Sequence, residues 1–353
     1  MTELGFYRDK KVFVTGHTGF KGTWLCHILR AAGAQVTGYA LVPPTSPSLF
    51  ALTGVESDIR SVTGDIRDPD ALQAAMNAAD PEIVLHLAAQ PLVRESYQYP
   101  VYTYGVNVMG TVNLLEAVRQ SDTVRSVVNV TTDKVYLNQE RAEGYREDEE
   151  LKGFDPYSNS KSCSELVTYS YKNAYFAGGN GRPILPVSTA RAGNVIGGGD
   201  FAKDRILPDC VRAAVEGKPI AVRNPRSTRP YQHVLEPLFA YLMIARRQYE
   251  NPALAGAYNV GPDDEGCYET GALVDLFIRV WGGGLKRVIS GDGGAHEANY
   301  LKLDCTKLKS AFGWQPRWAL QTAVEKTVEW TKVWQSGGDV NACMTEQIRE
   351  YIG

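Results

Sequence analysis

The chain lacks the features that would hold a metal ion or cross a membrane. Its six Cys and five His show no CxxC, HExxH or paired Cys/His spacing, so we expect no metal site. No apolar run approaches the roughly 18 residues that a membrane-spanning helix needs. The N-terminal stretch is polar and charged, unlike an apolar signal segment. These absences predict a cytoplasmic protein with no membrane contact, whose scattered thiols stay reduced.

Charge and composition give no indication that the chain binds nucleic acid. The formal net charge is -3, and charged residues make up 22% and hydrophobic residues 44% of the chain. These proportions are ordinary for a soluble globular protein, and the slightly negative balance argues against nucleic-acid binding. No internal repeat or low-complexity segment occurs. The 353 residues give room for one large domain or two.

Short apolar segments alternate with helical patterns in the first half of the chain. Strands are predicted at 11–15, 35–40, 60–63, 82–87, 126–130 and 184–190, with helices at 20–32 and 102–120 and others starting near 68 and 155. This alternation predicts an α/β fold with a Rossmann-type, doubly wound parallel sheet over residues 1–190. From about residue 193, glycine and proline punctuate shorter elements. We expect residues 191–353 to form a smaller mixed α/β lobe, some segments of which return to the first domain.

Glycines at the first strand-to-helix turn are typical of a phosphate-binding loop. They follow a GxxGxxG spacing, and such a turn lets the backbone approach a pyrophosphate while the helix N-terminus supplies free N–H groups. A tight turn that binds nothing is the alternative, but the position at the start of an α/β pattern favours a dinucleotide. The residues predicted to hold it are Gly16, His17, Thr18, Gly19, Phe20, Lys21 and Gly22.

Further contacts to the dinucleotide are expected where the next strands end. Residues 39–41 offer no acid for the adenosine ribose and no Arg for a 2′-phosphate. The missing Arg disfavours NADP, although this segment alone does not decide between NAD and NADP. We predict that Asp65 and Ile66 hold the adenine, with a simple turn cap as the alternative. Small residues after the fourth strand would let a flat cofactor lie against the chain, namely Leu87, Ala88 and Ala89; a plain strand end is the alternative there.

A tyrosine and a lysine one helical turn apart provide a base for an alcohol. Asp155 as N-cap and Pro156 at the first position place Tyr157 in the first turn, with Lys161 on the same face. An ammonium and a helix N-terminus both favour a phenolate. A solvated helix face is the alternative. After a dinucleotide loop, the pair predicts that Tyr157 deprotonates an alcohol during hydride transfer and that Lys161 assists it and contacts the cofactor.

The segment after the fifth predicted strand adds a second acid/base couple. Thr132 is placed to hydrogen-bond the hydroxyl that Tyr157 deprotonates, which leaves Asp133 and Lys134 unused by simple hydride chemistry. Oxidising a sugar C4 hydroxyl makes the C5 hydrogen acidic, so a base can remove it while an acid protonates the departing C6 hydroxyl. Asp133 would be the acid if burial keeps its carboxyl protonated, and Lys134 the base if nearby positive charge favours its neutral form. A surface Asp-Lys turn is the alternative.

Several segments together resemble one family. They are 16–25 (GHTGFKGTWL), 131–136 (TTDKVY), 155–161 (DPYSNSK), 191–200 (RAGNVIGGGD) and 229–237 (RPYQHVLEP). The chain is similar to the nucleotide-sugar 4,6-dehydratases of the extended short-chain dehydrogenase/reductase superfamily, over about residues 8–335. The resemblance implies bound NAD, CDP-glucose as substrate and CDP-4-keto-6-deoxyglucose as product, for deoxysugar and lipopolysaccharide synthesis. It also implies a homodimer, or a tetramer of such dimers, built on the helix at 102–120 and the Tyr157 helix.

The same resemblance assigns roles within the site. It makes Tyr157 the base at C4, Lys161 its partner and ribose anchor, Thr132 the residue that orients the substrate and Asp133 the acid for water loss. The related dTDP-glucose enzymes look as though they place Glu where this chain has Lys134. The identity of the C5 base is therefore the point at which this chain departs from the pattern.

Basic residues in the second half are candidates for binding a diphosphate, since Arg holds phosphate oxygens in a two-pronged fork. Arg223, Arg226 and Arg229 crowd one loop, for which a solvated basic surface is the alternative. The predicted substrate contacts are Asn194, Arg205, Arg229, His233 and Tyr300, the last following the glycine-rich stretch 291–294.

Two other functions fit parts of the pattern. An NAD-dependent nucleotide-sugar 4-epimerase shares the fold, the Tyr/Lys pair and the cofactor, but it needs neither a C5 base nor a C6 acid. A non-catalytic NAD-binding regulator would be expected to lack Tyr157 or Lys161. The presence of Asp133 and Lys134 favours the dehydratase.

Overall fold

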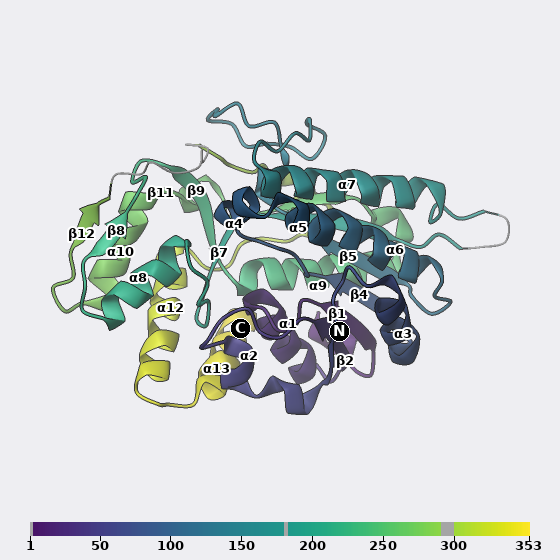
Figure 1. The fold of residues 1–353 in the computed structure, drawn as a ribbon, viewed down its shortest axis with the longest axis horizontal. Helices are drawn as coiled ribbons and strands as arrows, with labels where there is room; N and C mark the ends of the chain where they lie inside the picture. Colours follow the sequence, from purple (N-terminus) through teal and green to yellow (C-terminus); the bar gives the residue numbers. More distant parts are fainter. Residues whose placement is uncertain (1–2, 180–182, 291–299) are drawn as a thin grey trace.

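A seven-stranded parallel sheet forms the centre of the molecule (Figure 1). The computed structural model describes residues 3–179, 183–290 and 300–353. The strand order is β3-β2-β1-β4-β5-β6-β10. The strands are β1 (Lys11–Thr15), β2 (Gln35–Ala40), β3 (Arg60–Thr63), β4 (Ile83–His86), β5 (Ser126–Val130), β6 (Val187–Ala192) and β10 (Ala257–Val260). The chain adds strands outward from β1 in one direction and then from β4 in the other, so a crevice opens at the carboxyl ends of β1 and β4.

Helices cover both faces of this sheet. Along β1, Phe13 enters the core on one face while Val12 and Val14 enter the core on the other, as the two-residue strand period requires. One face carries α3 (Pro69–Ala79), α6 (Gly110–Arg119) and α7 (Pro156–Ala174), and the other carries α1 (Phe20–Ala31) and α9 (Leu235–Glu250). Ahead of α6 lie α4 (Val93–Gln98), α5 (Pro100–Tyr104) and the π-helical turn η3 (Gly105–Met109).

A smaller mixed lobe lies at one end of the sheet, on the left in Figure 1. Its three-stranded sheet has the order β11-β9-β7, in which β9 runs antiparallel to β11 and parallel to β7. These strands are β7 (Asn194–Ile196), β9 (Thr228–His233) and β11 (Cys267–Glu269), and a second pair is formed by β8 (Ile220–Val222) and β12 (Arg287–Ile289). Its helices are α8 (Ile206–Val215), α10 (Thr270–Trp281) and α12 (Leu320–Gln335), whereas α13 (Val340–Ile352) packs against α12 and into the core of the main sheet.

The remaining elements are short. They are η1 (Leu4–Tyr7), α2 (Leu49–Thr53), η2 (Val55–Asp58), η4 (Asp133–Val135), η5 (Pro252–Leu254), η6 (Asp264–Gly266) and α11 (Thr306–Phe312). Among the described residues, no helix combines the length and the apolarity that crossing a bilayer demands.

The predicted fold class is confirmed. Strand β10 and helix α9 come from the second half of the chain and complete the first-half sheet, as expected of segments that return to the first domain. The division at residue 190 stays a prediction. The predicted helix at 102–120 is present as α5, η3 and α6 in succession, with a π-helical turn inside it.

Candidate active site

A large cleft lies between the sheet and the smaller lobe. Its volume is about 1240 Å³, more than one drug-sized ligand needs. Both halves of the chain line it, with Lys21, Thr132, Lys134 and Tyr157 on one side and Asn194, Arg205 and Arg229 on the other. The cleft therefore brings most of the predicted catalytic and substrate residues together.

The glycine loop between β1 and α1 has the shape of a phosphate cradle. Gly16 has a positive φ of 76°, and a Cβ there would lie 2.7 Å from the backbone nitrogen of Ala88. A Cβ on Gly22 would lie 2.1 Å from the Gly16 carbonyl oxygen. Gly19 is the N-cap of α1, and no side chain caps the helix, so its first N–H groups are available to an anion. The loop fits the pyrophosphate of NAD.

Side chains near this loop refine the prediction. The His17 ring is buried, hydrogen-bonds Ser61 Oγ at 2.8 Å and packs against Phe50, so only its backbone can face a cofactor. The Asp65 carboxylate accepts from the backbone N–H of Arg67 at 2.9 Å and from its guanidinium at 2.6 Å. Asp65 thus caps a turn, as the alternative reading proposed, and the adenine role of Asp65 and Ile66 stays a prediction.

The predicted catalytic residue Tyr157 lies in the first turn of α7, where the Asp155 cap and Pro156 place it. Asp155 Oδ1 accepts from Ser158 N at 2.9 Å, and Ser96 Oγ accepts from Tyr157 N at 3.1 Å. The Lys161 ammonium donates to the Val130 carbonyl at 3.1 Å. These contacts tie the first turn of α7 to the carboxyl end of β5.

Burial changes the pKa of both groups. It raises the pKa of Tyr157 to about 12, against a smaller lowering by a hydrogen-bonding interaction with Thr132. Burial lowers the pKa of Lys161 to about 8. Without cofactor or substrate, the expectation that Tyr157 favours its phenolate form is wrong, because desolvation of the side chain outweighs the effect of nearby positive charge. The low pKa of Lys161 has the same cause.

A compact hydrogen-bond network joins Thr132, Asp133 and Lys134. Thr132 Oγ1 donates to Asp133 Oδ1 at 2.9 Å, and the Lys134 ammonium donates to the same oxygen at 3.1 Å. The ammonium also donates to Asn194 Oδ1 at 3.3 Å. Asp133 is fully buried, and its second oxygen, Oδ2, has no hydrogen-bond partner. The surface-turn alternative is therefore excluded for Asp133.

A buried ion pair anchors this segment from behind. Glu165 on α7 accepts from Thr131 at 2.5 Å and from Thr189 at 2.7 Å, and it pairs with Arg191 at 2.9 Å. Both charged side chains are 4% exposed. Since Thr131 directly precedes Thr132, the network fixes the catalytic segment relative to α7.

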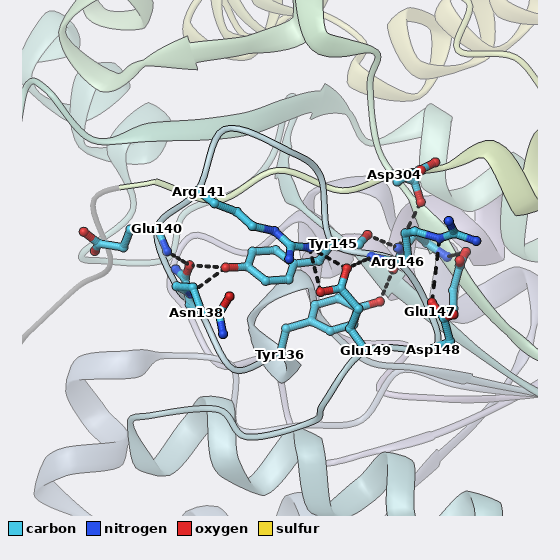
Figure 2. Close-up of polar contacts among 12 residues, drawn as sticks. Tyr136, Asn138, Glu140, Arg141, Tyr145, Arg146, Glu147, Asp148, Glu149 and Asp304 are labelled. Carbon is cyan, nitrogen blue, oxygen red and sulfur yellow. Dashed lines mark hydrogen bonds and ion pairs between the residues drawn. The ribbon is translucent and has the colours of Figure 1, made fainter.

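The chain that follows Lys134 is held by a cluster of polar contacts (Figure 2). Tyr136 stacks on Tyr145 with ring centroids 5.4 Å apart. The Arg141 guanidinium lies 4.4 Å from the Tyr145 ring centre and pairs with Glu149. Tyr145 also donates to Asn138 at 2.9 Å, and Asn138 lines the cleft. Packing and charge therefore hold this loop in place beside the site.

The predicted substrate residues divide into two groups. Arg205 pairs with Asp200 at 3.0 Å, Arg229 is buried, and both line the cleft with Asn194. His233 does not reach the cleft. Its ring is fully buried against Trp24 and Trp318, so the structure assigns it to packing instead of substrate contact.

Tyr300 lies at the margin of the site. Its backbone pairs with Thr228 and its carbonyl accepts from Asn138 at 3.0 Å. Its ring lies 5.6 Å from the Lys302 ammonium, and the neighbouring Leu301 lines the cleft. Its substrate role stays a prediction, and the stretch 291–294 lies outside the described residues.

Sequence reasoning missed an ionic cluster across the cleft. Arg94 of α4 lies 3.9 Å from Asp204, which also pairs with Arg223 at 2.7 Å. All three line the cleft. The sequence could have indicated Arg94, because it follows β4 at the edge of the sheet where the strands have their carboxyl ends. Its ion pair with Asp204 depends on the relative position of the two lobes, which the sequence does not reveal. In the part of the chain that the structure describes, no cluster of His, Cys, Asp or Glu suits a metal.

The model of one protein family matches this chain over residues 12–261, and its description is the NAD dependent epimerase/dehydratase family. The chain belongs to this family. The predicted NAD cofactor and the predicted family resemblance are thereby confirmed.

Relatives in the family include dehydratases. The chain is 46% identical to the CDP-glucose 4,6-dehydratase of Salmonella typhimurium, covering 100% of this chain and 99% of the relative. It is 27% identical to the dTDP-glucose 4,6-dehydratase of Xanthomonas campestris, covering 92% and 94%.

Solved structures of the family share the fold. The UDP-glucose 4-epimerase of Thermotoga maritima matches with a TM-score of 0.80 at 20% identity, covering 92% of this chain and 99% of that one. The dTDP-glucose 4,6-dehydratase of Bacillus anthracis, solved with NAD, matches with a TM-score of 0.76 at 21% identity, covering 94% and 99%. At these identities, they show the fold alone.

Proposed function

We propose that this protein is a CDP-glucose 4,6-dehydratase, which converts CDP-glucose to CDP-4-keto-6-deoxyglucose. The observation that carries the proposal is the second acid/base couple beside Tyr157. Lys134 lines the cleft together with Tyr157, the residue that oxidation requires, and its ammonium contacts the fully buried Asp133. A 4-epimerase needs only Tyr157 and its cofactor, so the couple favours elimination of water. The full-length relative at 46% identity supports CDP-glucose as the substrate.

The C4 hydroxyl is handled by Tyr157 with help from Thr132. NAD, held at the glycine loop of residues 16–22, would supply the hydride acceptor and donor for this chemistry. Tyr157 takes the C4 hydroxyl proton as the hydride leaves, and Thr132 orients that hydroxyl. Lys161 stands one turn along α7 from Tyr157, where its ammonium would assist the phenol and hold the cofactor ribose.

Elimination uses the two remaining groups. With C4 oxidised, Lys134 acts in its neutral amine form and removes the acidic C5 proton, becoming an ammonium. Asp133 donates a proton to the departing C6 hydroxyl, which leaves as water. The hydrogen bonds from Thr132 and Lys134 to Asp133 Oδ1 support this role, because they hold the carboxyl beside the other proposed catalytic groups. Lys134 then returns a proton to C5.

Arginines on the smaller lobe fit the substrate diphosphate. Arg205 and Arg229 line the cleft opposite Tyr157, and guanidinium groups bind phosphate oxygens in pairs. Asn194 accepts from Lys134 and is placed beside the sugar. The product would feed deoxysugar synthesis, including that of lipopolysaccharide.

A homodimer is part of the proposal. Apolar side chains are exposed along α5, η3 and α7, and those more than half exposed are Val101, Met109, Leu166 and Tyr169. The two segments are neighbours on one face of the sheet (Figure 1), so a second copy would complete a four-helix interface. Six free thiols support a reducing, cytoplasmic location.

The activity is tested by offering a panel of nucleoside-diphosphate glucoses without added cofactor. We expect CDP-glucose alone to yield a 4-keto product, detected by its absorbance in alkali. With tritium at C4 of the hexose, the label should appear in the product methyl group. A C4 epimer without loss of water would identify an epimerase, and a methyl group free of tritium would contradict the internal hydride return.

A further inference from the structure

The cleft extends along helix α8, beyond the residues assigned to the sugar and the diphosphate. From Arg205, the N-cap of α8, its lining continues through Asp209, Arg212 and Glu216. These four residues follow one another at helical spacing, so they form one stripe on α8. In a nucleotide sugar, the base and the sugar lie on opposite sides of the diphosphate. With the sugar at Tyr157 and the diphosphate at Arg205, the base falls on the later part of this α8 stripe.

Two acidic side chains lie on the α8 stripe, and Asp209 is the one better placed to meet a base. It lies one helical turn beyond Arg205, about 6 Å along the helix axis, and its side chain is 33% exposed. Glu216 is the C-cap of the helix. The Glu216 side chain is 50% exposed and pairs with Lys218. Asp209 is therefore both nearer to the diphosphate position and less solvated than Glu216.

Arg212 holds the Asp209 carboxylate in a fixed orientation. Its guanidinium donates to Asp209 Oδ1 and also to the backbone carbonyls of Phe201 at 3.1 Å and Ala202 at 3.2 Å. Burial raises the pKa of the Asp209 carboxyl, whereas the charge of Arg212 lowers it and favours the carboxylate. Among the described residues, none donates a hydrogen bond to the second oxygen, Oδ2. This oxygen is therefore available to accept a hydrogen bond from a ligand in the cleft.

A fixed carboxylate distinguishes cytosine from the other pyrimidine bases. Cytosine carries a donating amino group at C4, from which Asp and Glu side chains accept. Uracil and thymine carry an oxygen there, and two acceptors facing each other repel and leave the carboxylate without a hydrogen bond. Given the proposed function, on which this inference rests, we propose that Asp209 selects the base of the substrate. Its Oδ2 accepts from the cytosine amino group and excludes uracil and thymine.

The test measures, by titration calorimetry, the binding of CDP, UDP and the pyrimidin-2-one analogue of CDP, which lacks the 4-amino group. The wild-type protein should bind CDP roughly 10- to 100-fold more tightly than the analogue, as for loss of a hydrogen bond to a charged group. UDP should bind no better than the analogue. In Asp209→Asn, the amide can donate to the uracil oxygen, so the preference for CDP over UDP should fall by about tenfold or more. Glu216→Gln, the matched control on the α8 stripe, should keep the wild-type preference.

Equal affinity of the wild-type protein for CDP and the analogue would overturn the proposal, and this comparison requires no variant to fold. An unchanged preference for CDP in the Asp209→Asn protein would overturn it equally. Loss of the preference in Glu216→Gln instead would assign the selection of the base to Glu216. Failure of the proposed function is separate, because the wild-type protein would then form no 4-keto-6-deoxy product from CDP-glucose, whichever nucleotide it binds.

Discussion

At the scale of single residues, Lys134 gives the most specific prediction, because it is the proposed base at C5. Its ammonium contacts both Asp133 and Asn194, between the acid and the substrate lobe. Lys134→Met keeps the aliphatic stem and removes the amine. We expect the rate of water elimination to fall by about 10²–10⁴-fold, as for loss of a positioned base. Oxidation of the substrate at its C4 hydroxyl, and the accompanying reduction of the cofactor, should still occur. Proton NMR in D₂O should show no deuterium at C5.

Asn194→Ala provides the matched control for this variant. It removes the second acceptor of the Lys134 ammonium but leaves the amine and the contact to Asp133. Deuterium should still enter C5 of the product, even if turnover is slower. Normal deuterium entry in the Lys134→Met protein would place the base elsewhere.

The sequence predicts which residues gather at the site better than it predicts their state. Thr132 follows the end of β5, and Tyr157 lies in the first turn of α7, which Lys161 ties to that strand end. The raised pKa of Tyr157 follows from burial, which no local pattern reveals. His233 shares a strand face with Arg229 by the two-residue period, yet Trp24 and Trp318, both distant in sequence, enclose its ring. Packing between distant segments decides such cases.

At the scale of elements, buried parallel strands are the most predictable part of the fold. β1, β2 and β5, which are largely buried, have the predicted limits, and so does β3, although none of its residues is buried. The π-helical turn η3 was not predicted. There, Asn107 hydrogen-bonds Gln90 and Ser160, partners that only the folded chain brings close. The place of α9 and β10 on the first-half sheet likewise depends on long-range packing.

The buried pair between α7 and β6 should be a major source of stability. Glu165→Gln would leave Arg191 buried without a counter-charge, and we expect it to lower the free energy of unfolding by about 3–5 kcal/mol. Glu116→Gln on α6 is the control, because its pair with Arg119 is exposed and should contribute less than about 1 kcal/mol. Urea denaturation of both variants measures the difference. Equal effects of the two variants would show that burial does not determine how much an ion pair contributes to the free energy of unfolding.

The exposed apolar face of α5, η3 and α7 gives a second prediction for elements. Leu166 is 55% exposed and Tyr169 is 70% exposed on α7. If this face pairs two copies, charges there should separate them, because unpaired charges are costly in a buried interface. We expect Leu166→Glu with Tyr169→Glu to halve the mass measured by light scattering. Gln73→Glu on α3, which lies outside this face, should leave the mass unchanged. An unchanged mass in the double variant would place the interface elsewhere.

At the scale of the whole molecule, distant segments close the fold around the site. Glu236 at the start of α9 accepts from the backbone of Arg317 and Trp318 and from the Tyr351 hydroxyl. This ties the last helix, α13, to the helix beneath the main sheet. The two sides of the cleft are thereby connected through buried contacts as well as through the chain, which favours one cooperative unfolding transition.

Buried histidines should make that transition sensitive to acid. Burial lowers the pKa of His17 and His27 to about 4 and of His86 and His233 to about 3, against about 6.5 when unfolded. Below pH 6.5 the unfolded chain binds more protons than the folded chain. The free energy of unfolding therefore decreases as the pH is lowered, by roughly 1 kcal/mol per buried His at pH 5.5 relative to neutral pH. His27→Gln can keep a hydrogen bond to Thr345. Its loss of unfolding free energy between pH 7.5 and 5.5 should be smaller than that of the wild-type protein by the contribution of one buried His, roughly 1 kcal/mol. Urea midpoints at both pH values measure it, and an identical loss in the variant would mean that His27 does not contribute.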